Sequence, residues 1–454
     1  MVIAIDSAQS LPTEDQALSL IEAVIAQSQA EAVVVKLTGG DSALSRFSSN
    51  QMTQNISETK LTLSVTSLFG HRSATASTTD LDPDTLRATL RRSEELAQVA
   101  PEDPEFVPLL EPQTYNAAVP AFDAATASSS PLVRGEWVQQ VTALSNQAGV
   151  DGSGTLSTEA RLRAIGNSRG LRACDRTTLA EFSFTARTAT GSGSSWGTRT
   201  AFALDQLPIT ELTEQLIERS LQSRQPRELS PGQYPVILDP AAFSSLLPWV
   251  AWNLDGRAAD EGRSFMSRTD DQGKPVGSRV REPLFSPLVQ VYRDPAHPLL
   301  QLGHFFLQDD GLKADRLAFI EAGVPVTLAY SRYWAQQQGV EATGPLAPLV
   351  MTGSDQSLND LIAQTERAIL ISRAWYVRYV NPRTLVVTGM TRDGTFWIEN
   401  GKIVYPIKNL RFNQSLPEML QAVDAVSQAQ RFDNNVVPGV RVKAFNFTSI
   451  TDSI

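Results

Sequence analysis

Residues 177–190 read Thr-Thr-Leu-Ala-Glu-Phe-Ser-Phe-Thr-Ala-Arg-Thr-Ala-Thr, an alternation of period two. Successive side chains of a β-strand point to opposite faces, so this stretch predicts a long strand in a sheet with one face in water. Residues 59–68 alternate in the same way and lead through the turn Gly70-His71-Arg72 into residues 74–79. This second pattern predicts an antiparallel hairpin.

Helical patterns surround these strands. Residues 12–29 carry an apolar face behind Thr13, a candidate N-cap, and Asp82-Pro83 has the form of a strong helix start. Two further helices are predicted over residues 135–148 and 211–223. The first half of the chain therefore combines helices with an antiparallel sheet.

The second half is rich in strand and turn patterns from about Tyr234 onward. We expect two helices there, one over residues 240–256 and one that starts at Ser354 or Ser357 and includes Ile369. The predicted fold class is α+β, with an N-terminal α/β domain built on an antiparallel sheet and a C-terminal β-rich domain with a few helices. The predicted domains are residues 1–230, with a linker-like segment at 100–131 rich in Pro, Ser and Ala, and residues 231–454.

Composition excludes several classes of protein. The 454 residues carry a net charge of −10 with scattered Lys and Arg, so we expect no direct nucleic-acid role. No apolar run approaches the length of about 18 residues that a membrane span needs. The first residues show no basic region followed by an apolar stretch, so we expect no secretory signal and a cytoplasmic protein.

The chain holds three histidines, His71, His297 and His304, and one cysteine, Cys174. No pair of them has the spacing of a zinc motif, and a single cysteine cannot form an internal disulfide. The histidines are interpreted as turn, loop and core residues, and Cys174 as a small buried apolar side chain. The sequence thus offers few side chains for metal or nucleophile chemistry.

Several segments together resemble the TldD/PmbA family, also called the modulator of DNA gyrase family, whose metal-bearing members are zinc metallopeptidases. The resemblance covers roughly residues 30 to 430 and rests on their order: Arg46-Phe-Ser-Ser-Asn, Gly232-Gln-Tyr-Pro-Val-Ile-Leu-Asp-Pro, Gly256-Arg-Ala-Ala-Asp-Glu-Gly-Arg-Ser-Phe, Gln308-Asp-Asp-Gly-Leu-Lys-Ala, Asp393-Gly-Thr-Phe-Trp-Ile-Glu-Asn-Gly-Lys-Ile and Pro406-Ile-Lys-Asn-Leu-Arg-Phe.

The resemblance implies where a metal site would lie. TldD-type members carry His-Glu-x-x-x-His on a helix and a downstream Cys, and the Glu is suited to be the general base. An ungapped placement puts Pro248, Trp249 and Asn253 at the His, Glu and second His positions. The downstream stretch from Tyr379 to Leu385 has no Cys. We therefore expect no catalytic residue, no metal ligand and no cofactor in this chain.

This departure is similar to the PmbA (TldE) branch, the metal-free partner of TldD in a two-subunit protease. The leading hypothesis is such a subunit, which helps to degrade or process short or unfolded peptides while a TldD-type catalytic subunit supplies the zinc. The partner could instead be a second copy of this chain. Two alternatives remain: a solo peptidase with a relocated site that uses carboxylates with His304, and a non-enzymatic peptide-binding scaffold.

Five further residues are candidates for a peptide groove or an interface. Arg257 and Arg263 could hold a substrate carboxylate or a partner's acidic side chain, and an intramolecular salt bridge is equally compatible with the pattern. Asp309, Asp310 and Gly311 could line a peptide groove, although an ordinary acidic turn is favoured. Trp249 and Trp252 are predicted to anchor helix packing or an interface.

Overall fold

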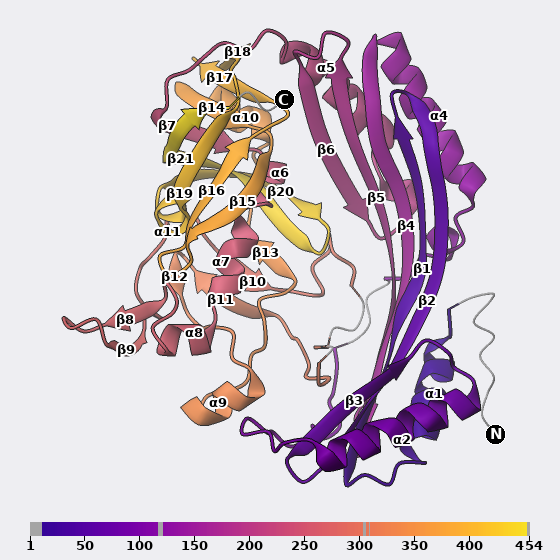
Figure 1. Cartoon of the computed structure of the whole chain (residues 1–454). Coiled ribbons are helices and arrows are strands. Elements are labelled where there is room, and N and C mark those ends of the chain that lie inside the picture. Colours follow the sequence, from indigo (N-terminus) through magenta and orange to yellow (C-terminus); the bar gives the residue numbers. More distant parts are fainter. Residues whose placement is uncertain (1–10, 117–120, 303–305, 308, 452–454) are drawn as a thin grey trace.

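The computed structural model describes residues 11–116, 121–302, 306–307 and 309–451 (Figure 1). A long antiparallel sheet from the first half of the chain stands beside a β-rich second half. No helix among the described residues is long and apolar enough to cross a membrane.

The N-terminal sheet has six strands, and its four inner strands run for 17 to 19 residues each. All neighbours are antiparallel, as the period-two pattern predicts. Their order is β3 (Arg72–Thr78), β2 (Gln51–Phe69), β1 (Ala32–Ser48), β4 (Val150–Asn167), β5 (Arg172–Thr188) and β6 (Ser194–Ala201).

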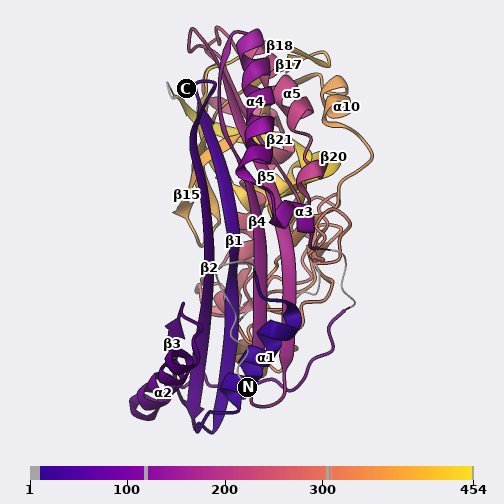
Figure 2. The same ribbon diagram turned by 90° about the vertical axis from the view of Figure 1, so that its right-hand side faces the viewer.

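Helices cover the outer face of this sheet in two groups, one at each end (Figure 2). The first group is α1 (Glu14–Ile25) and α2 (Pro83–Val99). The second is α3 (Ala124–Ala127), α4 (Pro131–Gln147), the 3-10 helix η1 (Leu204–Gln206) and α5 (Ile209–Gln222). The predicted caps are confirmed, because the Thr13 side chain accepts from the amide of Gln16 and Asp82 accepts from the amides of its helix's first turn.

The second half forms a thirteen-stranded mixed sheet in which β7–β14 and β13–β21 are parallel pairs. Its main path is β12 (Val324–Pro325), β11 (Leu317–Glu321), β10 (Val291–Arg293), β13 (Leu349–Met351), β21 (Asn435–Ile450), β7 (Gly232–Leu238), β14 (Arg367–Ile371), β17 (Thr395–Glu399) and β18 (Lys402–Pro406). Four strands branch from it: β15 (Ala374–Asn381), β16 (Val386–Thr391), β19 (Leu410–Ser415) and β20 (Val423–Phe432).

Short elements complete this half. They are the hairpin of β8 (Ser267–Thr269) and β9 (Pro275–Ser278) and the helices α6 (Pro240–Phe243), α7 (Leu247–Asn253), α8 (Gly256–Asp260), α9 (Arg332–Gln338), α10 (Leu358–Ala363) and α11 (Leu416–Gln421). The predicted α+β class, with a β-rich C-terminal half, is confirmed.

Two predicted helices were wrong in extent. Residues 240–256 form two short helices and the start of α8, because Pro248 has no amide proton to donate to the carbonyl of Ser244 and so cannot continue a helix across that point. The helix predicted to include Ile369 ends at Ala363, and Ile369 lies in β14. Residues 368–371 are buried on both faces of a central strand, where an apolar run imitates a helix face.

One cluster joins the two halves. The guanidinium of Arg373 lies between two indole rings, 3.9 Å from the centroid of Trp196 on β6 and 4.1 Å from that of Trp375 on β15. It also forms an ion pair of 2.7 Å with Asp393, whose other carboxylate oxygen accepts a hydrogen bond from Ser194. The side chain of Arg373 is thus largely buried between the two halves.

Candidate functional site

Helix α7 carries the positions that the resemblance assigns to a metal motif. Pro248 lies in its first turn, which fits a residue without an amide proton, and Trp249 and Asn253 are half-buried. The Asn253 amide donates to the carbonyl of Trp249 at 2.7 Å and to the hydroxyl of Tyr379 at 2.8 Å. The rings of Trp249 and Tyr379 meet edge to face at 4.6 Å.

In TldD-type members, the resemblance implies, the zinc ligands come from two segments of the chain. These contacts bring the two corresponding segments of this chain together. The helix supplies Trp249 and Asn253, and the downstream stretch supplies Tyr379. Zinc in proteins is held by thiolate, imidazole and carboxylate groups, and this cluster contains none of them. The residues present therefore do not fit a zinc ion.

The same region exposes large aromatic side chains. Trp252 is 66% exposed and stacks edge to face on Trp249 at 5.4 Å. On β15, Tyr376 is 60% exposed and Tyr379 is 41% exposed. Trp252 and Tyr379 both pack on Trp249, and exposed tryptophan and tyrosine side chains are typical of protein-interface anchors.

Arg257 and Arg263, in and just after α8, are both bound within the chain. Arg257 forms a bidentate pair with Glu105, with Nη2–Oε1 2.8 Å and Nη1–Oε2 2.9 Å, and contacts Glu261 at 3.0 Å through Nε. Arg263 pairs with the other oxygen of Glu261. The hydrogen bonds that Arg257 donates to Glu105 and, second, to Glu261 raise its pKa. A role for either arginine toward peptide or partner stays a prediction.

Asp309, Asp310 and Gly311 form a turn against the N-terminal half. Asp310 accepts from the amide of Leu312 at 3.0 Å, and the Tyr115 hydroxyl donates to the carbonyl of Gly311 at 2.6 Å. Burial and, second, the charge of Asp310 raise the pKa of Tyr115 to about 12. Gly311 has φ +83°, and a Cβ there would lie 2.8 Å from Leu171, so the turn requires glycine.

Helix α9 connects the two candidate groups. Arg332 forms an ion pair with Asp310 at 3.5 Å, and the ring of Trp334 lies 5.1 Å below the guanidinium of Arg257. The acidic turn and Arg257 therefore belong to one polar surface centred on α9. No described contact joins this surface to Trp249 or Asn253.

The remaining reactive side chains lie apart. His71 stacks on Phe106 at 4.5 Å, and the ring nitrogen of His297 accepts from the amide of Leu299, while His304 lies outside the described residues. Burial raises the pKa of the Cys174 thiol to about 12. Within the described ranges, no group of three or more His, Cys, Asp or Glu side chains could hold a metal ion.

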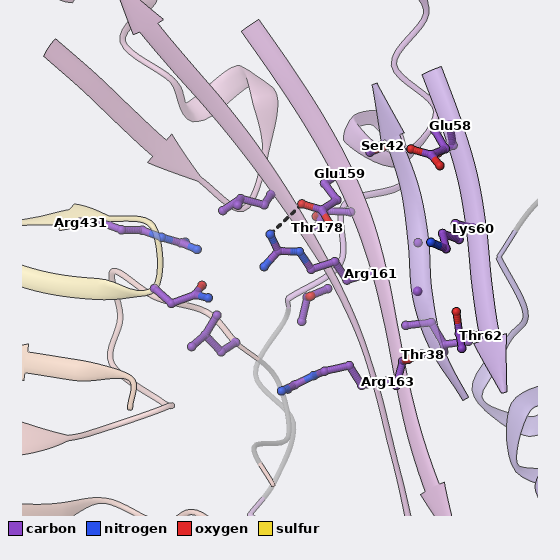
Figure 3. A pocket seen from close by; sticks show the side chains of 17 residues that line it. Thr38, Ser42, Glu58, Lys60, Thr62, Glu159, Arg161, Arg163, Thr178 and Arg431 are labelled. Carbon is purple, nitrogen blue, oxygen red and sulfur yellow. Dashed lines mark hydrogen bonds and ion pairs between the residues drawn. The ribbon is translucent and has the colours of Figure 1, made fainter. Parts of the chain in front are cut away.

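Sequence reasoning missed a charged cavity of about 510 Å³ between the inner face of the N-terminal sheet and the β20–β21 hairpin (Figure 3). Its volume falls in the range of about 300–1,000 Å³ that ligand sites occupy. Charged side chains on its walls come from β2, β4 and β20: Glu58, Lys60, Glu159, Arg161, Arg163 and Arg431.

Two sequence signals could have indicated this cavity. Gly39-Gly40 interrupts a strand pattern, and a glycine inside a strand marks a close backbone approach. Gly39 has φ +145°, and a Cβ on it would lie 2.0 Å from the carbonyl oxygen of Lys60. Arg161-Leu162-Arg163 places two cations on one face of a strand, which is unusual beside buried apolar neighbours.

The comparisons with known proteins agree with this fold. The sequence profile of the PmbA/TldA metallopeptidase C-terminal domain matches residues 231–449, and that of the PmbA/TldA metallopeptidase central domain matches residues 114–224. The chain belongs to the PmbA/TldD metallopeptidase family.

Among curated relatives, the metalloprotease PmbA of Escherichia coli O157:H7 is 20% identical over 450 residues, which cover 96% of each chain. The PmbA homologue of Haemophilus influenzae is 24% identical over 220 residues, and there the alignment spans 45% of the relative and 47% of this chain.

Solved structures share the fold. TldE from Thermococcus kodakarensis superposes with a TM-score of 0.83 at 18% identity, over 95% of this chain and 100% of that one. A protein from Bacteroides thetaiotaomicron, described as a modulator of DNA gyrase, gives 0.83 at 19% identity, over 97% and 100%. These TM-scores establish the architecture of the chain.

Proposed function

We propose that this chain is the metal-free subunit of a two-subunit zinc protease that processes short or unfolded peptides. The observation that carries the proposal is the contact of Trp249 and Asn253 with Tyr379, at the place where the family's metal motif would lie. In this proposal the framework around the family's metal site is kept, and an aromatic and amide cluster takes the place of the metal-binding groups.

Chemistry at this cluster is limited by its donors. The hydroxyl of Tyr379 accepts a hydrogen bond from Asn253, and the Asn253 amide nitrogen is already donating twice. A general base for zinc-bound water is most often an imidazole or a carboxylate within hydrogen-bond reach, and Trp249, Asn253 and Tyr379 provide neither group. The proposal therefore assigns zinc, base and attacking water to a TldD-type partner chain.

The exposed side chains of Trp252 and Tyr379, which are linked through Trp249, support a partner at this place. Burying an exposed tryptophan in an interface stabilises the complex, and truncation of such anchors costs about 2 kcal/mol or more. In this proposal the partner's catalytic helix approaches the face that carries Trp252.

A free strand edge supports peptide binding. Strand β3 pairs with β2 only from Leu63 to Phe69, and within the described chain residues 51–62 of β2 pair on one side only, with β1. An extended peptide could add to this edge through main-chain hydrogen bonds, which are insensitive to side-chain identity. Such binding would suit a subunit that presents unfolded peptides of varied sequence.

The test is co-expression of this chain with a TldD-type chain, followed by co-purification and an assay with an unfolded peptide. Activity should require both chains and disappear when the partner's His-Glu-x-x-x-His motif is mutated. Trp252→Ala should weaken the complex at least tenfold, while the control Leu132→Ala, which removes a 72% exposed side chain from α4, should leave it unchanged.

Other outcomes would point to the rival functions. Chelator-sensitive cleavage by this chain without a partner would indicate a solo peptidase with a relocated site. A stable homodimer that binds peptides, does not cleave them and ignores a TldD-type chain would indicate a scaffold. Either result would contradict the proposal.

A further inference from the structure

The inner face of the N-terminal sheet carries three successive rows of side chains across β2, β1 and β4. The middle row is Lys60, Gly40 and Arg161, because Gly40 pairs with Lys60 on one side and with Arg161 on the other. Neighbouring strands are about 4.8 Å apart, so the two cations flank a gap of about 10 Å that holds no side chain. All three residues line the charged cavity.

A third cation reaches this gap from the opposite wall. Arg431 at the end of β20 points toward Arg161 across the cavity, and its side chain is buried (Figure 3). Its Nε donates to the carbonyl of Asp433 at 2.8 Å and its Nη1 to that of Leu300 at 2.8 Å. Its Nη2 has no hydrogen-bond partner among the described residues, so the guanidinium is rigidly held with one donor edge unused.

The other two cations also keep donors available. Arg161 uses Nη2 in a 2.7 Å pair with Glu159, which fixes the orientation of its guanidinium, and none of its other donors is bonded within the described chain. Lys60 is exposed and forms no ion pair with any described residue. Glu58 also lines the cavity and reduces its positive charge.

Charge counting shows that the cavity differs from the rest of the protein. Its lining holds four cations and two carboxylates, a balance of +2, in a chain whose net charge is −10. Desolvation, opposed by Asp433 and assisted by repulsion from Arg161, lowers the pKa of Arg431 to about 10. An anion between the guanidiniums would relieve this repulsion and satisfy the open donors.

We propose that this cavity binds the free C-terminal carboxylate of a short peptide between Arg161, Lys60 and Arg431. The peptide as ligand rests on the proposed function and on the free edge of β2, whose residues Lys60 and Thr62 belong both to that edge and to the cavity wall. Arginine forms the planar, bidentate contacts that a carboxylate requires, and lysine adds a point charge.

The test measures binding to this chain without a partner and without metal, by calorimetry with N-acetyl-tetra-alanine as the free acid and as its C-terminal amide. The free acid should bind at least about tenfold more tightly, because a hydrogen bond to a charged group is among the strongest polar contacts. Arg161→Gln and Lys60→Gln should each weaken binding of the acid by a similar factor.

Arg367→Gln is the matched control, because Arg367 is also in an exposed strand ion pair, with Glu399 at 3.1 Å, and is not part of the cavity lining. It should bind the acid as the wild type does. The side chains that are replaced in the three variants are exposed or partly exposed, so the variants should keep the fold. Circular dichroism verifies this.

Equal affinity for acid and amide, no binding of either, or unchanged affinity in Arg161→Gln would overturn the proposal. So would an amidated peptide with one Glu that binds as tightly as the free acid, or inorganic phosphate that binds more tightly than the peptide. The co-expression test can fail while this binding succeeds, and the reverse, so the two proposals are separable.

Discussion

Replacing Arg373 with Met should destabilise the protein by about 3–5 kcal/mol, because this arginine is one partner of a buried ion pair. The side chain of Arg373 is 15% exposed and that of Asp393 is 2% exposed. Methionine keeps much of the packing between Trp196 and Trp375 and removes the charge. The buried Asp393 carboxylate is then left with the hydroxyl of Ser194 and a more distant Arg392, at 3.6 Å.

A double-mutant cycle isolates this pair. Asp393→Asn is the suitable second change, because Asp393 has φ +53° and asparagine tolerates that conformation. Each variant loses part of the free energy of unfolding. The sum of the losses in the two single variants should exceed the loss in the double variant by at least about 1 kcal/mol, because residues in one polar network do not act additively.

Equilibrium unfolding in urea, followed by tryptophan fluorescence, measures all four proteins. The two halves of the chain should unfold in one transition in the wild type and separate in Arg373→Met. A loss below about 1 kcal/mol in Arg373→Met, or additivity within about 0.5 kcal/mol, would refute the claim that this cluster joins the halves.

Three further predictions are tested by different measurements. Gly39→Ala should destabilise the protein by about 1–3 kcal/mol or more, because its backbone conformation strains any residue with a Cβ. Gly135→Ala, which has open space around it in α4, should stabilise the protein by about 0.5–1 kcal/mol. Urea midpoints of the two variants that change in the same direction would contradict this. Hydrogen bonds led by that from Thr85 lower the pKa of Asp82 to about 2, so the stability that Asp82 adds is present above about pH 4 and is lost as the pH falls to 2. The stability of Asp82→Ala should therefore fall less between about pH 4 and about pH 2 than that of the wild type. Identical pH profiles of stability in the two proteins would contradict the role of Asp82 as a helix cap. The thiol of Cys174, whose pKa burial raises to about 12, should react with a disulfide reagent at pH 8 only after unfolding, and a rate independent of denaturant would disprove its burial.

Local sequence patterns predicted much of the fold. Period-two alternation placed the strands around Leu63 and Phe182, and the caps Thr13 and Asp82 set two helix starts, because such signals depend on residues adjacent in the chain. The pattern failed at Pro248 and Ile369, where a missing amide proton and burial in a central strand outweigh apolar periodicity.

The site could be predicted only in part. The replacement of metal-motif residues by Pro248, Trp249 and Asn253 was visible in the sequence, but the bond from Asn253 to Tyr379 joins residues 126 positions apart. The cavity depends on strand register and on Arg431, which reaches it from the other half of the chain. Single-sequence reasoning has no access to such long-range pairing.

Metal analysis of the purified chain tests the central claim most directly. Expressed without a partner in medium supplemented with zinc and then desalted, the protein should contain far less than one zinc per chain by mass spectrometry, and added zinc should not raise its melting temperature. One tightly held zinc per chain, removed only by a chelator and accompanied by a loss of thermal stability, would contradict a metal-free role.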